Sequence, residues 1–219
     1  MTSLRHNSGL GSGADREPRD VYLDAARACI LDVGWRRTTL TEVARRAGVS
    51  RMTIYRTWSD MPELLGDLMT REWGGLVAST QPTMGVDGDG QSDGPEPGQI
   101  ADGVLRAVAV LRDNELFVRI VELDPELILP YLLARRGRSQ ELILGLLATV
   151  IGAGQQTGTV RAGNPDALAR GVVLAAHGFV LSAHTMADDA VSSDELDEEL
   201  RLLVTRFLTP AQIAEGAAR

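Results

Sequence analysis

The sequence predicts an all-α fold, with a three-helix unit at the N-terminus and a larger helical domain after it. Apolar residues recur three or four positions apart through most of the 219 residues, and no segment alternates in the manner of a β-strand. Proline and capping residues stand where these helices begin, and glycine stands where several of them end. A hydrophobic content of 44% is ordinary for a soluble globular protein and allows a sizeable core.

Changes in composition along the chain predict its domain organisation. Residues 1–15 are rich in Gly and Ser and predict a flexible tail, and residues 211–219 form a second tail. Residues 16–79 hold the three-helix unit and a connecting helix at 62–78. Residues 80–99, rich in Gly, Pro, Asp and Gln, predict a mobile linker, and residues 100–210 form the second helical domain.

Three short helices are predicted within the N-terminal unit. Residues 18–33 keep helical spacing, with Pro18 in the first turn and Gly34 at the end. Residues 40–47 form one apolar face of a second helix, which Thr39 or Thr41 can cap. A third helix follows at 51–58, with Ser50 as its cap.

The second and third helices have the spacing of a helix-turn-helix. Ala44 is small where the two helices cross, Gly48 reverses the chain, and Ile54 fills the gap left by the crossing. Residues 34–58 hold six Arg and one Glu, so 6 − 1 = +5. The outward side of the third helix carries guanidinium and hydroxyl groups, the equipment of a helix that enters the DNA major groove. The alternative is two packed helices with a solvated basic face.

The charge of the whole chain becomes consistent with this interpretation when it is resolved by region. The formal net charge is −8. Residues 1–80 hold 11 Arg and 10 acids, net +1, whereas residues 81–219 hold 11 Arg and 20 acids, net −9. Positive charge is therefore concentrated where a phosphate backbone would lie, and the acidic remainder argues against an architectural protein that binds any DNA.

The rest of the chain reads as a succession of helices. Amphipathic segments are predicted at 100–111 and 114–123. Asp124-Pro125-Glu126 opens another helix, with Pro130 inside it as a kink or a restart. Residues 139–155 are apolar nearly all round, which predicts a largely buried helix. Asn164-Pro165-Asp166 starts a helix that runs to about 187, and Ser193-Asp194-Glu195 caps a last one that runs to 208.

The segment GWRRTTLTEVARRAGVSRMTIYRTWSDMPELL, residues 34–65, resembles the N-terminal signature of the TetR (tetracycline-repressor-like) family of transcriptional regulators. The resemblance covers about residues 17–77, and the remainder is similar in architecture alone. It implies a homodimer that binds double-stranded operator DNA, most often as a repressor released by a small-molecule effector. One departure is Met61, which stands where the family usually has a phosphate-binding Lys.

The resemblance also implies roles for individual residues. Thr39 contacts a phosphate, Tyr55 meets the DNA backbone, and side chains of the third helix face base edges. The implied DNA-binding set is Thr39, Ser50, Arg51, Met52, Thr53, Tyr55 and Arg56. Arg51 can bridge guanine O6 and N7, which discriminates by about 1–3 kcal/mol. Because one short helix reads only a few base pairs, a second copy on a pseudo-palindromic site is the economical arrangement.

Small and apolar stripes on the last two predicted helices suggest the dimer interface. These are Gly171, Ala175, Gly178 and Ser182 on one helix, and Leu196, Leu200, Leu203 and Phe207 on the other. Two such helices from each subunit can form a four-helix interface. The alternative is that both stripes pack inside one subunit, because periodicity cannot say whose core a face enters.

A pocket for an apolar or amphiphilic effector is implied by the resemblance, with ordinary core packing as the alternative. The candidate lining residues are Leu105, Phe117, Leu123, Leu132, Leu146, Leu147 and Phe179. They are apolar and lie between the predicted linker and the predicted dimer helices.

An enzyme or a metal sensor is the competing function class. His177 and His184 lie seven apart on one predicted helix, and Asp188 follows four residues later. No HExxH spacing, activated nucleophile or phosphate-cradling glycine loop accompanies them, so we predict no catalytic residue, no cofactor and no metal. Cys29 is the only cysteine and no run approaches the roughly 18 apolar residues of a membrane span, so we expect a cytoplasmic protein.

Overall fold

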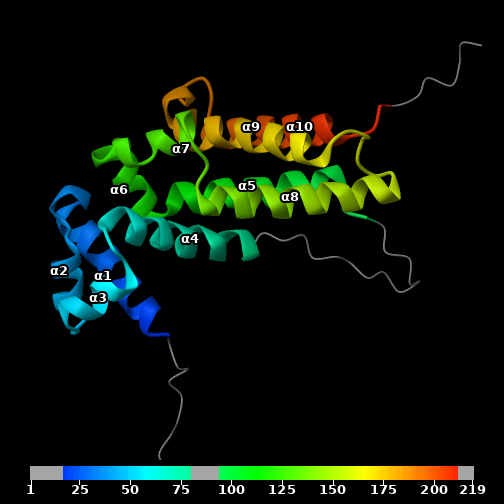
Figure 1. Cartoon of the computed structure of the whole chain (residues 1–219). Helices are drawn as coiled ribbons and strands as arrows, with labels where there is room; N and C mark the ends of the chain where they lie inside the picture. The colour runs from blue at the N-terminus through cyan, green and yellow to red at the C-terminus, as the bar shows by residue number, and fades with distance from the viewer. Residues whose placement is uncertain (1–16, 80–93, 212–219) are drawn as a thin grey trace, which may run out of the picture. The chain divides into compact units, whose positions relative to one another are not determined.

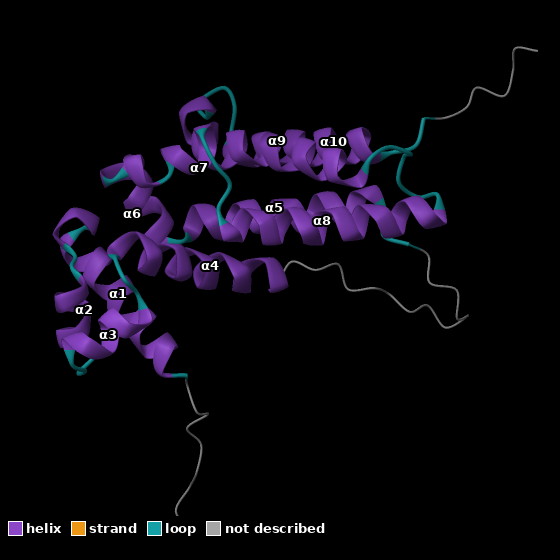
Figure 2. Ribbon diagram, viewed as in Figure 1, coloured by secondary structure: helices purple, strands orange, loops and turns teal. Residues whose placement is uncertain are grey.

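The computed structural model describes residues 17–79 and 94–211, and their regular secondary structure is helical throughout (Figure 1, Figure 2). The predicted all-α class is therefore confirmed. The chain divides into two compact units, residues 1–64 and 65–219, and the division falls inside α4 (Met61–Ser79). The composition of the sequence predicts the boundary after residue 79. The predicted tail at 1–15, residues 80–93 of the predicted linker at 80–99, and all but the first residue of the predicted tail at 211–219 lie outside the described residues.

The first unit contains three helices around a small core. They are α1 (Pro18–Val33), α2 (Leu40–Arg46) and α3 (Arg51–Thr57), with the short 3-10 helix η1 (Trp35–Arg37) between α1 and α2. The core comprises Leu23, Ala26, Cys29, Ile30, Leu40, Val43, Ala44, Ile54, Trp58 and Leu64. The predicted positions of all three helices are confirmed to within one or two residues.

The second unit is a helical bundle. Its main helices after α4 are α5 (Pro97–Asp113), α6 (Glu115–Leu123), α8 (Arg138–Thr157), α9 (Pro165–Met186) and α10 (Ser193–Leu208). Helix α5 packs against α9 and α10, α8 packs against α9, and α9 packs against α10, as Figure 1 shows. The bundle core includes Ile100, Val108, Ile151, Val172, Leu200, Val204 and Leu208.

An ion pair and hydrogen bonds from one arginine join three of these helices. Arg112, in the last turn of α5, donates from Nη1 to both carboxylate oxygens of Asp197 on α10, at 2.8 and 3.1 Å. Its Nε and Nη2 donate to the carbonyl oxygen of Phe179 on α9, at 3.2 and 3.0 Å. A charge-assisted fork of this kind fixes geometry as well as adding energy, so it holds α9 and α10 in register on α5.

Several element boundaries differ from the sequence-based prediction. Helix α5 begins at Pro97, inside the predicted linker, because the side chain of Gln99 accepts the N–H of Glu96 and caps the helix early. The segment after Asp124 forms a 3-10 turn, η2 (Pro125–Leu127), and then a five-residue helix, α7 (Leu129–Leu133), so Pro130 lies in the first turn of a new helix; of the two predicted alternatives, the restart is found and the kink is not. The cap of α10 is Ser192, one residue before the predicted one.

Helix α8 is much less buried than its composition predicts. Of its 20 residues, only Ser139, Ile151 and Gly154 are buried, and Leu142 is 46% exposed. The prediction was wrong because α8 packs through one side against α9 and leaves apolar side chains on its other sides at the surface. Helix α9 is long and apolar enough to cross a membrane by length and composition alone, a test that core helices of soluble proteins also pass.

Candidate nucleic-acid interface

Helix α2 is fixed at its start by a capping residue and along its inner side by the core. Thr39 is the cap, and its hydroxyl accepts the backbone N–H of Glu42 at 3.2 Å. Leu40 and Val43 are buried, and Ala44 is only 1% exposed where α2 meets its neighbours. The start of α2 thus places the exposed Thr39 at the surface of the unit.

The turn between α2 and α3 depends on one glycine. Gly48 has a φ of 70°, in the left-handed region that other residues adopt at a cost. A Cβ added there would meet no atom within 4 Å, so backbone conformation and not space requires glycine. The N–H of Val49 then bonds to the carbonyl oxygen of Ala44 at 3.0 Å, which closes the turn.

Helix α3 is anchored at one residue and exposed over most of its surface. Ile54 is fully buried, and Ser50 caps the helix by accepting the N–H of Thr53 at 3.2 Å. Met52 is 69% exposed and Tyr55 is 49% exposed, unusually high values for large apolar and aromatic side chains. The helix therefore presents an outward face that the first unit itself does not cover.

The arginines of α2 and α3 differ in their partners. Arg45 forms a forked ion pair with Glu42, with Nη2–Oε1 at 2.6 Å, and this bond holds the pKa of the Glu42 carboxyl below its usual value. Arg46 pairs with Asp32 of α1. By contrast, within the described ranges no acidic side chain lies at ion-pair distance from Arg51 or Arg56. Unneutralised positive charge is therefore concentrated on α3.

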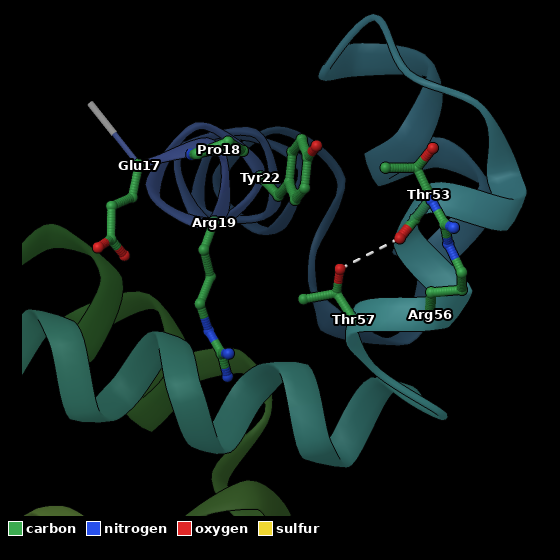
Figure 3. Close-up of a pocket in the computed structure, with 7 residues that line it drawn as sticks. All are labelled: Glu17, Pro18, Arg19, Tyr22, Thr53, Arg56 and Thr57. Carbon is green, nitrogen blue, oxygen red and sulfur yellow. Dashed lines mark hydrogen bonds between the residues drawn. The ribbon is translucent and has the colours of Figure 1, made fainter. Parts of the chain in front are cut away.

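A cleft of about 460 Å³ lies between the start of α1 and one side of α3 (Figure 3). It is lined by Glu17, Pro18, Arg19, Tyr22, Thr53, Arg56 and Thr57. Tyr22 contacts the buried indole of Trp58 edge-on, with ring centroids 6.3 Å apart, and the Arg19 guanidinium lies 5.4 Å from the centre of the same indole. Trp58 therefore orients two lining side chains at once.

Comparisons with known proteins agree with this geometry. A sequence model of bacterial regulatory proteins of the tetR family matches residues 23–68. An uncharacterised HTH-type transcriptional regulator of Mycobacterium tuberculosis is 31% identical over 186 residues, which are 85% of this chain and 92% of that protein. This chain belongs to the tetR family. It is thus a DNA-binding transcriptional regulator, as its helix-turn-helix predicts.

Other relatives agree over part of the chain or in fold alone. The HTH-type regulator AqdR of Rhodococcus erythropolis is 38% identical over 72 residues. The TetR-family repressor QsdR of R. erythropolis has a TM-score of 0.61 at 17% identity, covering 87% of this chain and 94% of its own. SmeT of Stenotrophomonas maltophilia, the repressor of an efflux pump, has a TM-score of 0.59 at 21% identity, covering 89% and 91%. These two structures support the tetR fold over most of the chain.

The candidate effector residues do not form one lining in this tetR-family chain. Leu105, Leu147 and Phe179 pack, partly buried, against the core of the bundle. Phe117 is 6% exposed and contacts Trp73 edge-on at 6.0 Å, and Leu146 is half-buried. Leu123 and Leu132 lie at the surface, 53% and 36% exposed. The first three residues therefore pack on the bundle core, and a shared pocket lining stays a prediction.

The candidate dimer residues separate into two groups. Leu200 is fully buried in its own bundle, so its assignment to the interface is wrong. The Phe207 ring lies 3.0 Å from where a Cβ of Gly171 would stand, so these two residues pack on each other within one subunit. Gly178, Ser182 and Leu203 are exposed, and Ala175 and Leu196 are half-buried. Periodicity placed all eight on suitable stripes, but the angle between α9 and α10 decides which of them face inward.

The competing histidine constellation is not assembled. His177 is half-buried, and burial lowers its pKa, whereas His184 is exposed. The Asp188 carboxylate accepts the N–H groups of Ala190 and Val191 and so shapes the loop after α9. Among the residues that the structure describes, no group of three or more His, Cys, Asp or Glu side chains is placed to hold a metal ion.

Sequence reasoning missed the contribution of α1 to the candidate interface. Arg19 and Tyr22 lie three residues apart in the first turns of α1, and both border the cleft beside α3. The Arg-x-x-Tyr spacing puts both side chains on one side of α1, but no local pattern shows that this side borders a cleft beside α3. Thr57 was missed as well, although it lies one turn after Thr53 on the same side of α3.

Proposed function

We propose that this protein is a ligand-responsive repressor that binds a pseudo-palindromic operator as a homodimer. The observation that carries the proposal is the surface of α3, where Arg51 and Arg56 have no acidic partner within the described ranges and flank the exposed Met52 and Tyr55. A helix with unneutralised guanidinium groups and exposed hydroxyl groups suits the major groove, because phosphate oxygens and base edges can pair with the guanidinium charge and hydrogen-bond to the hydroxyl groups.

Within this interface the residues take different roles. Arg51, Met52 and Thr53 face base edges, and Arg51 discriminates by donating to guanine O6 and N7. Thr39, Tyr55 and Arg56 contact the backbone and set the register of the helix. Ser50 acts through the cap of α3, because its hydroxyl is already bonded to the Thr53 N–H and lies 2.8 Å from the Thr53 hydroxyl.

Helices α9 and α10 form the dimer interface in this proposal. Leu174 is 70% exposed and Leu203 is 48% exposed, and a Cβ on the exposed Gly178 would meet no atom within 4 Å. Such a surface of leucines and small residues is costly to leave in water and permits close approach of a second subunit. The interface therefore keeps Gly178, Ser182 and Leu203 from the predicted set and adds Leu174.

A small amphiphilic effector regulates the DNA affinity in this proposal. A group of apolar side chains is exposed around α6 and α7, and it consists of Leu123, Leu129 and Leu132. Two similar structures are a flavonoid-responsive regulator and SmeT in complex with triclosan, and their names support an organic effector here too. An effector that binds the DNA-incompetent shape more tightly shifts the population away from DNA, in proportion to its differential affinity.

The protein acts in the cytoplasm and is not an enzyme in this proposal. Its relatives are transcriptional regulators, and α9 contributes Leu168, Ala169 and Val172 to the bundle core. Both facts support a soluble regulator that reaches DNA directly.

Footprinting on the DNA that flanks its own gene tests the proposal, because regulators of this kind frequently control neighbouring genes. We expect a protected pseudo-palindrome, and Arg51→Ala should lower the preference for that site over unrelated duplex by about tenfold or more while the dimer persists. Arg45→Ala is the matched control, since Arg45 is an exposed arginine already paired with Glu42. Retained preference in Arg51→Ala would contradict the assignment of α3 as the reading helix.

A further inference from the structure

Helix α7 presents its apolar side to solvent. Leu129, Leu132 and Leu133 are three and four positions apart, so they share one side of the helix. Their exposed fractions are 47%, 36% and 79%. Among the elements of the described chain, α7 packs mainly against η2, the turn directly before it, so the bundle leaves this side of α7 uncovered.

The neighbouring helix α6 has the opposite arrangement. Its apolar residues Leu116, Phe117 and Ile120 are buried, as is usual for an amphipathic helix of a folded domain. By contrast, Leu133 of α7 is the most exposed large apolar side chain of the residues that the structure describes. Because three adjacent leucines are costly to leave in water, this side of α7 is suited to an apolar ligand.

Three arginines follow α7, and they differ in their partners. Arg136 pairs with Glu141 through Nε and Oε1 at 2.8 Å, and Arg138 pairs with Asp67 of α4 through Nη1 and Oδ1 at 3.1 Å. Within the described ranges, no acidic side chain lies at ion-pair distance from Arg135. Arg135 therefore keeps an unneutralised positive charge at the end of α7.

The guanidinium of Arg135 is held beside the leucines. It lies 5.2 Å from the centre of the Tyr131 ring, and the backbone N–H of Arg135 donates to the carbonyl oxygen of Pro130 at 2.9 Å. The carbonyl oxygen of Tyr131 in turn accepts a side-chain N–H of Gln140 at 3.2 Å. Arg135 comes three positions after Leu132, so the two side chains occupy neighbouring parts of the helix surface. Helix α7 thus carries an apolar strip that ends in a cation.

Two larger occupants fit this surface less well. A two-fold interface between copies of this chain would bring each Arg135 toward its counterpart, and five-residue α7 is far shorter than the roughly 20–30 residues that a stable interface uses on each side. A membrane rich in anionic lipid would repel residues 81–219, whose 11 Arg and 20 acids leave a net charge of −9. A single amphiphile has neither cost, because its chain covers the leucines and its head group meets one arginine.

We propose that α7 binds an amphiphile with a saturated chain and an anionic head group, such as a medium-chain carboxylate, with the three exposed leucines against the chain and Arg135 against the head group. The inference rests on the proposed function, in which an effector binds around α6 and α7, and it names the chemical class of that effector. It adds Leu133 and Arg135 to the residues that contact the effector. A guanidinium donates two parallel N–H groups to a carboxylate, whereas it repels a cationic head group.

The test measures the binding of single-chain amphiphiles to the whole chain by isothermal titration calorimetry, below their micellar concentrations. The probes are octanoate, decanoate and dodecanoate, with decyltrimethylammonium as the cation that has the same chain length as decanoate. Each added pair of carbons should tighten binding about fourfold, the value for methylene groups that are about half covered. Decyltrimethylammonium should bind at least about tenfold more weakly than decanoate.

Two exposed positions on α7 and after it locate the site. Arg135→Gln should weaken decanoate binding about tenfold and should not weaken decyltrimethylammonium binding. Arg136→Gln is the matched control, because Arg136 is already paired with Glu141, and should change decanoate affinity by less than about twofold. Leu133→Asn should weaken both probes about three- to tenfold, since Leu133 contacts the chain. Unchanged decanoate affinity in Arg135→Gln and Leu133→Asn would overturn the proposal, because the amphiphile would then bind elsewhere.

Duplex affinity in the presence of decanoate separates the proposed site from the proposed effector role. If decanoate binds with the expected variant effects and lowers the affinity for the footprinted duplex, both are supported. If it binds with those effects and leaves the duplex affinity unchanged, the site is supported and the effector role is contradicted. If no carboxylate binds, the site is overturned, and duplex binding still tests the regulator. A lower oligomeric state of Leu133→Asn in sedimentation velocity, or Leu133-dependent flotation with phosphatidylglycerol vesicles, would assign the surface to a second copy or a membrane and overturn the proposal.

Discussion

Two leucines on α10, three residues apart, test the division between subunit core and dimer interface. Leu200 is fully buried among Val204, Leu208 and the α5 side chains, whereas Leu203 is 48% exposed in the subunit. The substitutions Leu200→Ala and Leu203→Ala remove the same atoms from the same helix. We therefore expect different properties to change, because one side chain belongs to the core and the other to the proposed interface.

The expected magnitudes follow from burial. Leu200→Ala should lower the free energy of unfolding of the subunit by about 2–5 kcal/mol, the range for a leucine deleted from a packed core. Full burial of a leucine contributes about 1.5–3 kcal/mol, so covering the exposed half of Leu203 contributes about 0.7–1.5 kcal/mol per subunit. Two copies in a dimer double this value, so Leu203→Ala should raise the dimer dissociation constant about 10- to 100-fold.

Sedimentation velocity over a concentration series measures the dimer, and urea unfolding followed by circular dichroism measures the subunit. The unfolding experiments must be compared at one protein concentration, because dimerisation itself stabilises the folded subunit. An unchanged dissociation constant for Leu203→Ala would refute the assignment of this face of α10. Unfolding of Leu200→Ala at the urea concentration of the original protein would refute the position of Leu200 in the core.

Two further predictions concern titratable side chains. Burial lowers the pKa of His177 in the folded bundle, so the unfolded chain binds the proton more tightly, and the free energy of unfolding should fall as the pH drops below about 6.5. This loss should be smaller in His177→Gln than in His184→Gln. Urea unfolding at a series of pH values measures it. The Cys29 side chain is only 1% exposed, and this burial raises the pKa of its thiol. A thiol reagent should therefore modify Cys29 only when the first unit opens, and faster in Ile54→Ala. Rapid modification of the folded protein in native buffer would contradict this packing.

The fold was predictable where local chemistry determines it. Gly48 and Ser50 are read correctly from sequence, and Thr39 is one of the two predicted caps of α2, because a cap or a positive φ depends on only a few neighbouring residues. The segment after Asp124 was not, because a 3-10 turn followed by a five-residue helix has too few residues to show a period. Leu200 and Leu203 could not be separated, since both fit the same apolar stripe and only the packing of α10 against α5 distinguishes them.

The candidate interface also has residues that the sequence predicts and residues that it does not. The outward residues of α3 follow from helical spacing once Ile54 is taken as the inward residue, so Arg51, Met52 and Arg56 are available from sequence. Arg19 and Tyr22 are more than 30 residues earlier in the chain than Arg56 and join it only through the packing of α1 around Trp58. No local pattern encodes that approach.

The distribution of ion pairs explains how a chain with a net charge of −8 can bind a polyanion. The sum of +5 over residues 34–58 treats all its arginines alike, but Arg45 and Arg46 are neutralised by Glu42 and Asp32 at short range. These pairs lie within one unit, so they remove charge from α2 without affecting α3. In the proposed interface the potential that a phosphate meets is then set mainly by Arg51 and Arg56, because exposed charges beyond about 8 Å are largely screened at physiological salt. In the proposed function the acidic C-terminal region weakens attraction to DNA at large distances, which favours release from non-specific sites, while the local contacts of α3 retain the affinity for a matched site.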